Sequence, residues 1–188
     1  MGKYVKRNHK ENLDLAGLIF TLDTLLHFCY YHSTERGDKM ERAIYFDMDG
    51  TLADFYNEPG WLADLVAQKT DPYDKAEPLI TKEQLETIVQ TLKDRGYIVG
   101  IISWLSKVST NEYKKRVRRA KHNWLNKHFG QLFDEVHLVA YGTPKHRVAK
   151  IMPSILVDDN QGVTKAWAKH GGLAIDAKDI TKILQIVT

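Results

Sequence analysis

From residue 41 onward, short apolar runs rich in β-branched and aromatic residues alternate with stretches of helical spacing. This alternation is typical of βαβ units, in which crossover helices join parallel strands. It predicts an α/β fold with a mainly parallel sheet. The expected strands are 42–47, 97–103, 135–140, 154–159 and 172–176. The expected helices are 81–96, about 111–127, and 163–170 and 180–187 as later crossovers.

Polar side chains follow three of the expected strands. Parallel strands end at the same edge of a sheet, so these side chains should meet in one crevice. Four of them are carboxylates, which repel one another unless a cation neutralises them. A hard divalent ion such as Mg²⁺, with oxygen ligands, is the natural partner. The converging residues are Asp47 and Asp49, Ser103, and Asp158 and Asp159.

The first carboxylate pair suggests phosphoryl transfer. A carboxylate oxygen of Asp47 can attack phosphorus and form an aspartyl-phosphate, and Asp49 can act as general acid and then as general base. Gly50 permits the sharp turn, and Thr51 can donate a hydrogen bond that orients Asp49. An isolated Asp-x-Asp-Gly is often a calcium loop or a turn. The ordered polar residues that follow at later strand ends favour catalysis.

Two further residues complete the expected catalytic set. Ser103 would bind a phosphoryl oxygen. Lys145, which lies in "GTPKHRVAK" before the fourth strand, would balance charge as the phosphoryl group is transferred.

These residues resemble the motifs of the haloacid dehalogenase (HAD) superfamily. "DMDGT" at 47–51 is similar to its first motif, Ser103 to its second, Lys145 to its third and the Asp pair at 158–159 to its fourth. The resemblance covers residues 42–176. It implies a HAD-like Rossmannoid three-layer sandwich at 41–188. The sequence itself adds a small cap insertion at about 57–80 and an extra N-terminal helix.

A closer resemblance is to the 5'(3')-deoxyribonucleotidases, through residues 47–55 and "HNWLNKHFG" at 122–130. It implies a Mg²⁺-dependent phosphomonoesterase acting on (deoxy)nucleoside monophosphates. It also implies Asp47 as nucleophile, Asp49 as acid/base, and Mg²⁺ held by Asp47, the Asp49 carbonyl oxygen and an Asp of the final pair. We favour Asp159 as that ligand, with Asp158 as the second choice.

The chain departs from that subfamily at its second motif. Ser103-Trp104-Leu105 stands where the relatives usually have Thr-Ser-Pro, so one phosphate-binding hydroxyl is missing. Asn160 and Gln161 replace the usual Arg-Pro. These differences bear on nucleotide specificity more than on phosphatase chemistry.

Residues 57–80 are rich in Pro, Gly and aromatic residues, and they predict a small cap over the sheet. Specificity should come from this segment, because the phosphate end is common to all substrates. Aromatic rings there could stack on a base, although Trp61 could instead seat the cap on the sheet. The candidate substrate contacts are Thr51, Tyr56, Trp61, Tyr73 and Trp104.

The run "KKRVRRAKH" at 114–122 concentrates positive charge on one expected helix. It could steer phosphates or follow a polynucleotide, but a solvated helix face is the more frequent reason for such a run. The net charge of +3 is far from that of a polycationic nucleic-acid coat. A nucleic-acid partner is therefore not favoured. The alternatives to a nucleotidase are a phosphatase acting on nucleic-acid ends or on another small phosphate, and a non-catalytic HAD scaffold.

Residues 1–40 predict an amphipathic helical extension, with leucines on one side of 12–33. Asp14, Asp23 and His27 interrupt the apolar stretch, whereas a membrane span needs about 18 nearly uncharged residues. We expect packing against the domain or a second copy, with a peripheral membrane helix as the alternative. Met40 could itself be a translation start, so the chemistry should not need residues 1–39.

A single cysteine, Cys29, excludes an intrachain disulfide, and a reducing cytoplasm is the simplest location. The histidines show no metal spacing with one another, and we assign them no chemistry. They are His122, His128, His137, His146 and His170.

Overall fold

The computed structural model describes residues 41–107 and 110–187. The expected helical extension at 1–40, and with it the possible oligomer contact, lies outside the described residues. No helix in the described ranges combines the length and the apolar character that crossing a membrane requires.

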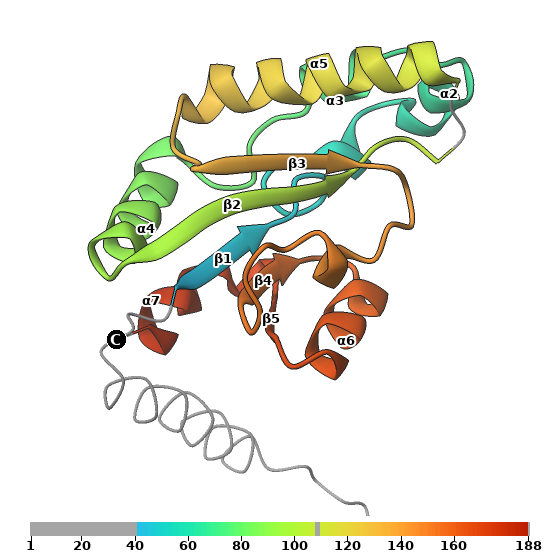
Figure 1. Ribbon diagram of the computed structural model, residues 1–188. Helices are drawn as coiled ribbons and strands as arrows, with labels where there is room; N and C mark the ends of the chain where they lie inside the picture. Colours follow the sequence, from blue (N-terminus) through green and yellow to red (C-terminus); the bar gives the residue numbers. More distant parts are fainter. Residues whose placement is uncertain (1–40, 108–109, 188) are drawn as a thin grey trace, which may run out of the picture. The chain divides into compact units, whose positions relative to one another are not determined.

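A five-stranded parallel sheet forms the centre of the domain (Figure 1), and it confirms the predicted α/β fold. Its strand order is β3-β2-β1-β4-β5. The chain therefore builds the sheet outward from β1 in one direction and then returns to the other side of β1 for β4. The strands are β1 (Arg42–Phe46), β2 (Tyr97–Trp104), β3 (Glu135–Val139), β4 (Ile155–Asp158) and β5 (Leu173–Asp176).

Both faces of the sheet are buried, which is why the strands read as nearly continuous apolar runs. Along β1, Ile44 and Phe46 enter one core cluster while Ala43 and Tyr45 enter another. The first cluster includes side chains of α4 (Lys82–Asp94), α5 (Asn111–Phe129) and α7 (Ile183–Ile186). The second includes α6 (Gln161–Lys169). Helices thus cover both faces and make three layers.

The expected helix starts are present. Thr81 and Gln84 form a reciprocal capping box at α4, and Thr110 accepts a hydrogen bond from the Tyr113 backbone N–H at α5. The expected helix at 180–187 is different. A 3₁₀ segment, η3 (Ala177–Lys182), precedes the four-residue α7, and both follow the last strand instead of crossing between strands.

The cap, defined as residues 57–80, contains α2 (Trp61–Val66) and α3 (Asp71–Lys75) after the short η1 (Phe55–Asn57). Its loop is tied to α5. The Tyr113 hydroxyl donates to the Lys69 carbonyl oxygen at 2.7 Å, and Arg116 donates to the Gln68 carbonyl oxygen at 2.8 Å. The Trp124 indole N–H, also on α5, donates to the Ala76 carbonyl oxygen at 2.6 Å. One helix therefore seats the whole cap.

Candidate active site

The carboxyl ends of β1 and β4 lie side by side where the strand order reverses. The Asp47 backbone N–H donates to the Val157 carbonyl oxygen at 2.8 Å, and Asp158 is the last residue of β4. In open parallel sheets, the crevice outside this switch point is where ligands bind. The structure brings to this edge all six residues expected there: Asp47, Asp49, Ser103, Lys145, Asp158 and Asp159.

Lys145 lies between two of the carboxylates. Its Nζ is 2.7 Å from Asp47 Oδ1 and 2.7 Å from Asp158 Oδ2. It is carried by η2 (Lys145–Arg147), a single 3₁₀ turn after β3, and it is almost completely buried. Burial alone would lower the pKa of this ammonium, but the two carboxylates outweigh burial and raise the pKa. Lys145 therefore remains charged beside the expected nucleophile.

Lys121 is a second buried lysine at the site, and the sequence interpretation missed it. Its Nζ donates to Asp49 Oδ2 at 2.6 Å, to Ser103 Oγ at 2.9 Å and to the Trp104 carbonyl oxygen at 2.8 Å. The side chain is fully excluded from solvent. A signal was present in the sequence, because Lys121 falls at helical spacing between the buried Val117 and Trp124.

The basic run at 114–122 is therefore not a simple solvated face. Lys121 enters the crevice, and the Arg116 guanidinium is bonded to the cap. Arg118 donates to the Leu138 carbonyl oxygen at 3.0 Å. Three of the basic side chains thus have internal partners, which weakens the case for a polynucleotide track.

Asp159 is held by a threonine instead of a lysine. Thr51 Oγ1 accepts a hydrogen bond from the Asp159 backbone N–H at 3.2 Å and lies 3.4 Å from Asp159 Oδ1. The expectation that Thr51 orients Asp49 was wrong, because the Thr51 hydroxyl is hydrogen-bonded to Asp159 instead. Within residues 41–107 and 110–187, the Asp159 carboxylate makes no ion pair.

Three carboxylates are close enough to share one metal ion. Asp47, Asp158 and Asp159 each offer an oxygen, and these oxygens lie within 4.8 Å of one another. When ionised, the crevice holds four carboxylates against two buried ammonium groups, so two negative charges remain unbalanced. The donor set and this residual charge fit a hard divalent cation.

The pKa values reflect the same crowding. Burial first, and then repulsion by Asp47, raise the pKa of Asp158 to about 7 and that of Asp159 to about 6. Lys145 partly opposes both shifts. A cation bound by these carboxylates would reduce the repulsion that raises their pKa values.

The two carboxylate oxygens of Asp49 have different surroundings. Burial raises its pKa, and the charge of Lys121 partly opposes the shift. Its Oδ2 accepts from Lys121, whereas its buried Oδ1 has no hydrogen-bond partner among the residues that the structure describes. Oδ1 is thus the oxygen that can carry or receive a proton.

Gly50 is required by close packing as well as by the turn. Its φ is +80°, and a Cβ at this position would lie 2.6 Å from Asp159 Oδ2 and 2.7 Å from Tyr56 Cε2. The glycine therefore lets the first loop approach Asp159 and Tyr56.

The candidate substrate contacts separate into two groups. Tyr73 is buried between the cap and α5, with its ring centroid 4.7 Å from that of Phe55, so the expectation that it stacks on a base was wrong. Trp61 is half-buried against Phe55 and Tyr56, as a residue that seats the cap would be. Tyr56, which is 50% exposed, and the half-buried Trp104 remain accessible.

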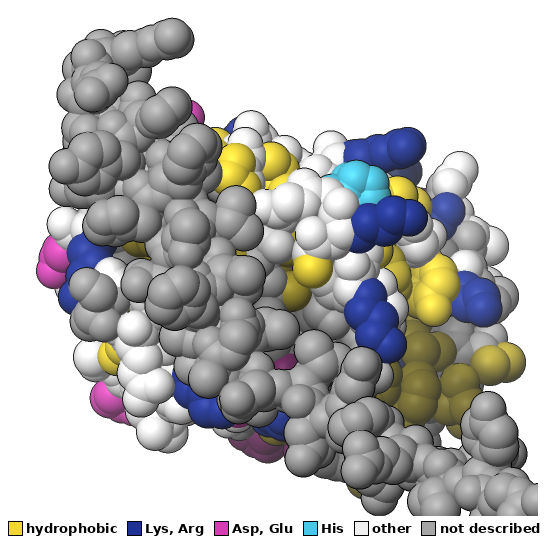
Figure 2. Space-filling model, turned by 90° about the horizontal axis from the view of Figure 1, so that it is seen from below, with side chains coloured by type: hydrophobic (Ala, Val, Ile, Leu, Met, Phe, Trp, Pro, Cys, Tyr) yellow, Lys and Arg dark blue, Asp and Glu magenta, His cyan; other side chains and the backbone are white. Residues whose placement is uncertain are grey.

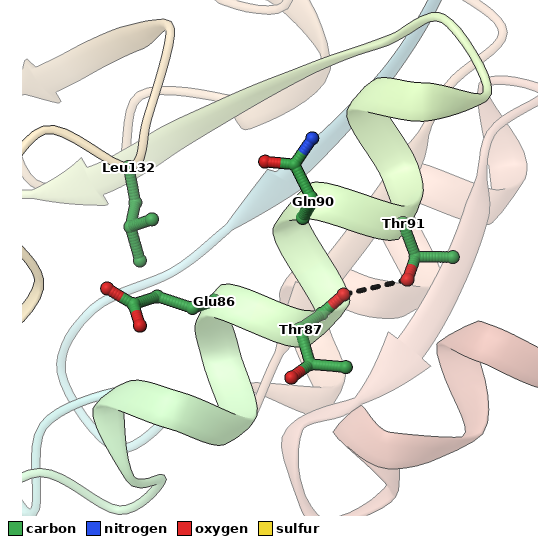
Figure 3. A pocket seen from close by; sticks show the side chains of 5 residues that line it. All are labelled: Glu86, Thr87, Gln90, Thr91 and Leu132. Atoms are coloured by element: carbon green, nitrogen blue, oxygen red, sulfur yellow. Dashed lines mark hydrogen bonds between the residues drawn. The ribbon is translucent and has the colours of Figure 1, made fainter.

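Two other surface features lie apart from this crevice. A shallow groove on α4 (Figure 3) contains Thr87 and Thr91, whose hydroxyls donate to carbonyl oxygens of their own helix. Figure 2 shows a histidine among Lys and Arg side chains on another face. His146 and His170 stack on each other, with ring centroids 3.6 Å apart. Within the described ranges, no histidine joins a group of three metal-binding side chains.

A solved HAD-like structure shares the fold. A HAD-like protein from Mesorhizobium loti aligns with a TM-score of 0.50 and 13% identity over 80% of this chain and 87% of that chain. The D,D-heptose 1,7-bisphosphate phosphatase from Burkholderia thailandensis aligns with a TM-score of 0.44 and 14% identity over 70% of this chain and 75% of that chain. A HAD family enzyme from Bacteroides thetaiotaomicron, solved with magnesium, aligns with a TM-score of 0.45 and 13% identity over 73% of this chain and 93% of that chain.

No family model and no curated protein matches the sequence. At such low identities the likeness to solved structures concerns the fold alone. The alignment with the Mesorhizobium loti structure confirms the expected HAD-like α/β architecture, and the chemistry must be argued from the residues of this chain.

Proposed function

We propose that this protein is a Mg²⁺-dependent phosphomonoesterase that works through an aspartyl-phosphate on Asp47, with (deoxy)nucleoside monophosphates as substrates. The observation that carries the proposal is the position of Asp47. Its carboxylate contacts the Lys145 ammonium and shares a possible cation site with Asp158 and Asp159. A carboxylate held in this way can approach a phosphate dianion without prohibitive repulsion.

In the first step, a carboxylate oxygen of Asp47 attacks phosphorus, and the bond from phosphorus to the ester oxygen breaks. Asp49 gives its proton to the departing alkoxide. The raised pKa of Asp49 supports this acid role, since a raised pKa keeps the carboxyl protonated at higher pH.

In the second step, Asp49 takes a proton from water as the water oxygen attacks the aspartyl-phosphate. The bond between phosphorus and the Asp47 oxygen then breaks, which releases inorganic phosphate and regenerates the Asp47 carboxylate. Ser103 can bind a phosphoryl oxygen during both steps, because its hydroxyl accepts from Lys121 and keeps its own proton to donate. Lys121 Nζ already directs its three N–H groups at Asp49, Ser103 and the Trp104 carbonyl oxygen, so it positions these groups.

Mg²⁺, when bound by Asp47, Asp158 and Asp159, would neutralise the negative charge of the phosphate and of the crevice. The donor chemistry and the two unbalanced charges of the crevice support this assignment. Lys145 keeps Asp47 and Asp158 together through its two ion pairs.

The nucleotide part of the proposal has separate support. Residues 47–55 and 122–130 resemble the deoxyribonucleotidases, and Lys121, which directly precedes the second stretch, reaches the crevice. Trp124 within that stretch seats the cap. Accessible aromatic side chains at Tyr56 and Trp104 offer stacking surfaces near the expected phosphate position.

The test is hydrolysis of a panel of nucleoside monophosphates and sugar phosphates with Mg²⁺, for the full chain and for Asp47→Asn. We expect Asp47→Asn to lower kcat by about 10⁴-fold or more, as loss of a nucleophile does. Asp74→Asn, an exposed cap carboxylate, is the matched control. Full activity in Asp47→Asn would exclude the mechanism, and a preference for sugar phosphates would exclude the nucleotide assignment alone.

A further inference from the structure

We propose that Trp104 and Tyr141 form a binding platform for the base of the substrate, on the side of the crevice away from the cap. This inference rests on the proposed phosphatase function and names the side chains that would give it specificity. The two ring centroids are 5.0 Å apart, and the ring planes are inclined by 52°. Trp104 ends β2 directly after Ser103, and Tyr141 lies in the turn after β3.

The platform begins beside the reacting groups. Lys145 Nζ lies 5.5 Å from the Trp104 ring centroid and 2.7 Å from Asp47 Oδ1. The carbonyl oxygen of Trp104 accepts a hydrogen bond from Lys121 Nζ, so the backbone of the same residue contacts the second buried lysine. Asp47 and the indole are therefore neighbours of the same ammonium group, which places the indole beside the expected phosphate site.

The rings are held in place without being buried. The Trp104 indole N–H donates to the Thr143 carbonyl oxygen at 2.8 Å, which fixes the indole to the turn that carries Tyr141. Lys107 Nζ lies 5.6 Å from the Tyr141 ring centroid, a cation–π distance. Tyr141 nevertheless remains 49% exposed. An aromatic surface that is ordered before the ligand arrives loses little entropy when a base stacks on it.

The aromatic group on the cap side is less suited to this role. Tyr56 makes edge contacts with both Phe55 and Trp61, at 5.4 Å and 5.3 Å between ring centroids. It also packs closely over Gly50. These contacts join the cap to the first loop, so the structure favours Trp104 and Tyr141 as the surface left for the base.

A matched pair of substrates isolates the base contact. Adenosine 5'-monophosphate and ribose 5-phosphate share the sugar and the phosphate and differ by the base. The readout is the ratio of their kcat/KM values in the full chain with Mg²⁺. We expect wild type to prefer the nucleotide, Tyr141→Ala to lower the ratio by about 5-fold or more, and Tyr141→Phe to retain it.

Tyr141 carries the test because its exposure makes misfolding of the variant a smaller concern than at Trp104. Tyr97→Ala is the matched control, since Tyr97 also has a cation over its ring, Arg42 at 5.8 Å, but begins β2 at the opposite edge of the sheet. Its ratio should equal that of wild type. An unchanged ratio in Tyr141→Ala, or a larger loss in Tyr56→Ala, would overturn the platform.

A binding measurement separates this inference from the proposed function. Calorimetric titration of full-length Asp47→Asn with the same two ligands reads the base contact without turnover, and Tyr141→Ala in that background should reduce the affinity ratio by a similar factor. Hydrolysis of phosphate esters without any preference for the nucleotide would overturn the platform and leave the phosphatase intact. Absence of all hydrolysis, with the binding ratio preserved, would overturn the catalytic proposal alone.

Discussion

Lys145 and Lys121 are two nearly solvent-free lysines in one crevice, and they neutralise different parts of it. Lys145 lies between two carboxylates, Asp47 and Asp158. Lys121 contacts one carboxylate, Asp49, and two neutral oxygens. The first lysine therefore balances charge around the proposed nucleophile, while the second holds the proposed acid/base residue and has its three N–H donors occupied. This difference predicts unequal consequences when each is removed.

The largest expected effect is on folding stability. Lys145→Met leaves Asp47 and Asp158 facing each other without their cation, and breaking a buried ion pair in this way costs about 3–5 kcal/mol of unfolding free energy. Lys121→Met should lower the unfolding free energy less, because it leaves one carboxylate without its counter-ion instead of two. Urea denaturation of both variants, without Mg²⁺, measures the difference.

Lys93→Met is the control for that comparison. Lys93 pairs with Asp134 at 2.7 Å, but both side chains are partly exposed. A surface pair of this kind is worth about 0–1 kcal/mol. If Lys145→Met is no more destabilising than Lys93→Met, the two ion pairs of Lys145 do not contribute as described.

Removal of Mg²⁺ should give the next largest effect, with a definite pH dependence. Asp158 and Asp159 have folded-state pKa values raised to about 7 and about 6, so the folded chain binds more protons than the unfolded chain over this range. Stability without metal therefore falls as pH rises from about 4 to about 7, which is the reverse of a carboxylate with a lowered pKa.

Mg²⁺ would offset this repulsion only where the carboxylates are ionised. At a hundred times its Kd, it should stabilise the fold by about 2.7 kcal/mol at about pH 8, which corresponds to a Tm rise of roughly 5–10 °C. At about pH 5, protons compete for the same oxygens and the rise should nearly vanish. Thermal scans with Mg²⁺ or with a chelator test this, and equal rises at both pH values would contradict a site at these carboxylates.

Lys121 should act on the pH dependence of catalysis. Its charge opposes the burial that raises the pKa of Asp49, so Lys121→Met should raise this pKa further. The proposed first step needs protonated Asp49, and its rate falls as pH rises through that pKa. The alkaline limb of the pH profile should therefore move to higher pH.

The leaving group offers the control. An ester with an acidic leaving group, such as 4-nitrophenyl phosphate, needs little protonation of the departing oxygen. Its alkaline limb should move much less in Lys121→Met than that of an alkyl phosphate. The same shift with both esters would show that Lys121 does not act through Asp49.

The sequence predicted the parts of this crevice that depend on strand periodicity. Apolar runs that end in Asp47, Ser103 and Asp158 identify the strand ends, and the parallel topology brings such ends together. Contacts made from a helix were not predictable in the same way. A lysine at 121 has the helical spacing of a buried residue, but only the tertiary structure shows that its ammonium group contacts the Asp49 carboxylate.

The directions of side chains in tight loops could not be predicted from the sequence either. Thr51 was expected at Asp49 because the two are neighbours in the chain, yet its hydroxyl is bonded to Asp159, which is 108 residues away in sequence. Tyr73 was expected at the substrate because it is an aromatic residue in the cap, yet it is buried in a cluster that joins the cap to α5. In both cases packing across distant segments decided the outcome.

Thr51→Val should produce the smallest effect, and it tests the carboxylate that neither lysine holds. The substitution keeps the shape of the side chain and removes the hydroxyl that binds the Asp159 backbone N–H and approaches Oδ1. Loss of an outer contact of this kind typically weakens metal affinity by about 10-fold or more. Mg²⁺ titration followed by Tm should show that loss with little change in metal-free stability.

Thr87→Val is the matched control for this last comparison. It also removes a threonine hydroxyl, one that donates to the Glu83 carbonyl oxygen on an exposed face of α4. Its Mg²⁺ affinity should equal that of wild type. If Thr51→Val binds Mg²⁺ as tightly as Thr87→Val, then Asp159 does not depend on Thr51 for its orientation, and Asp47 and Asp158 must hold the ion largely without it.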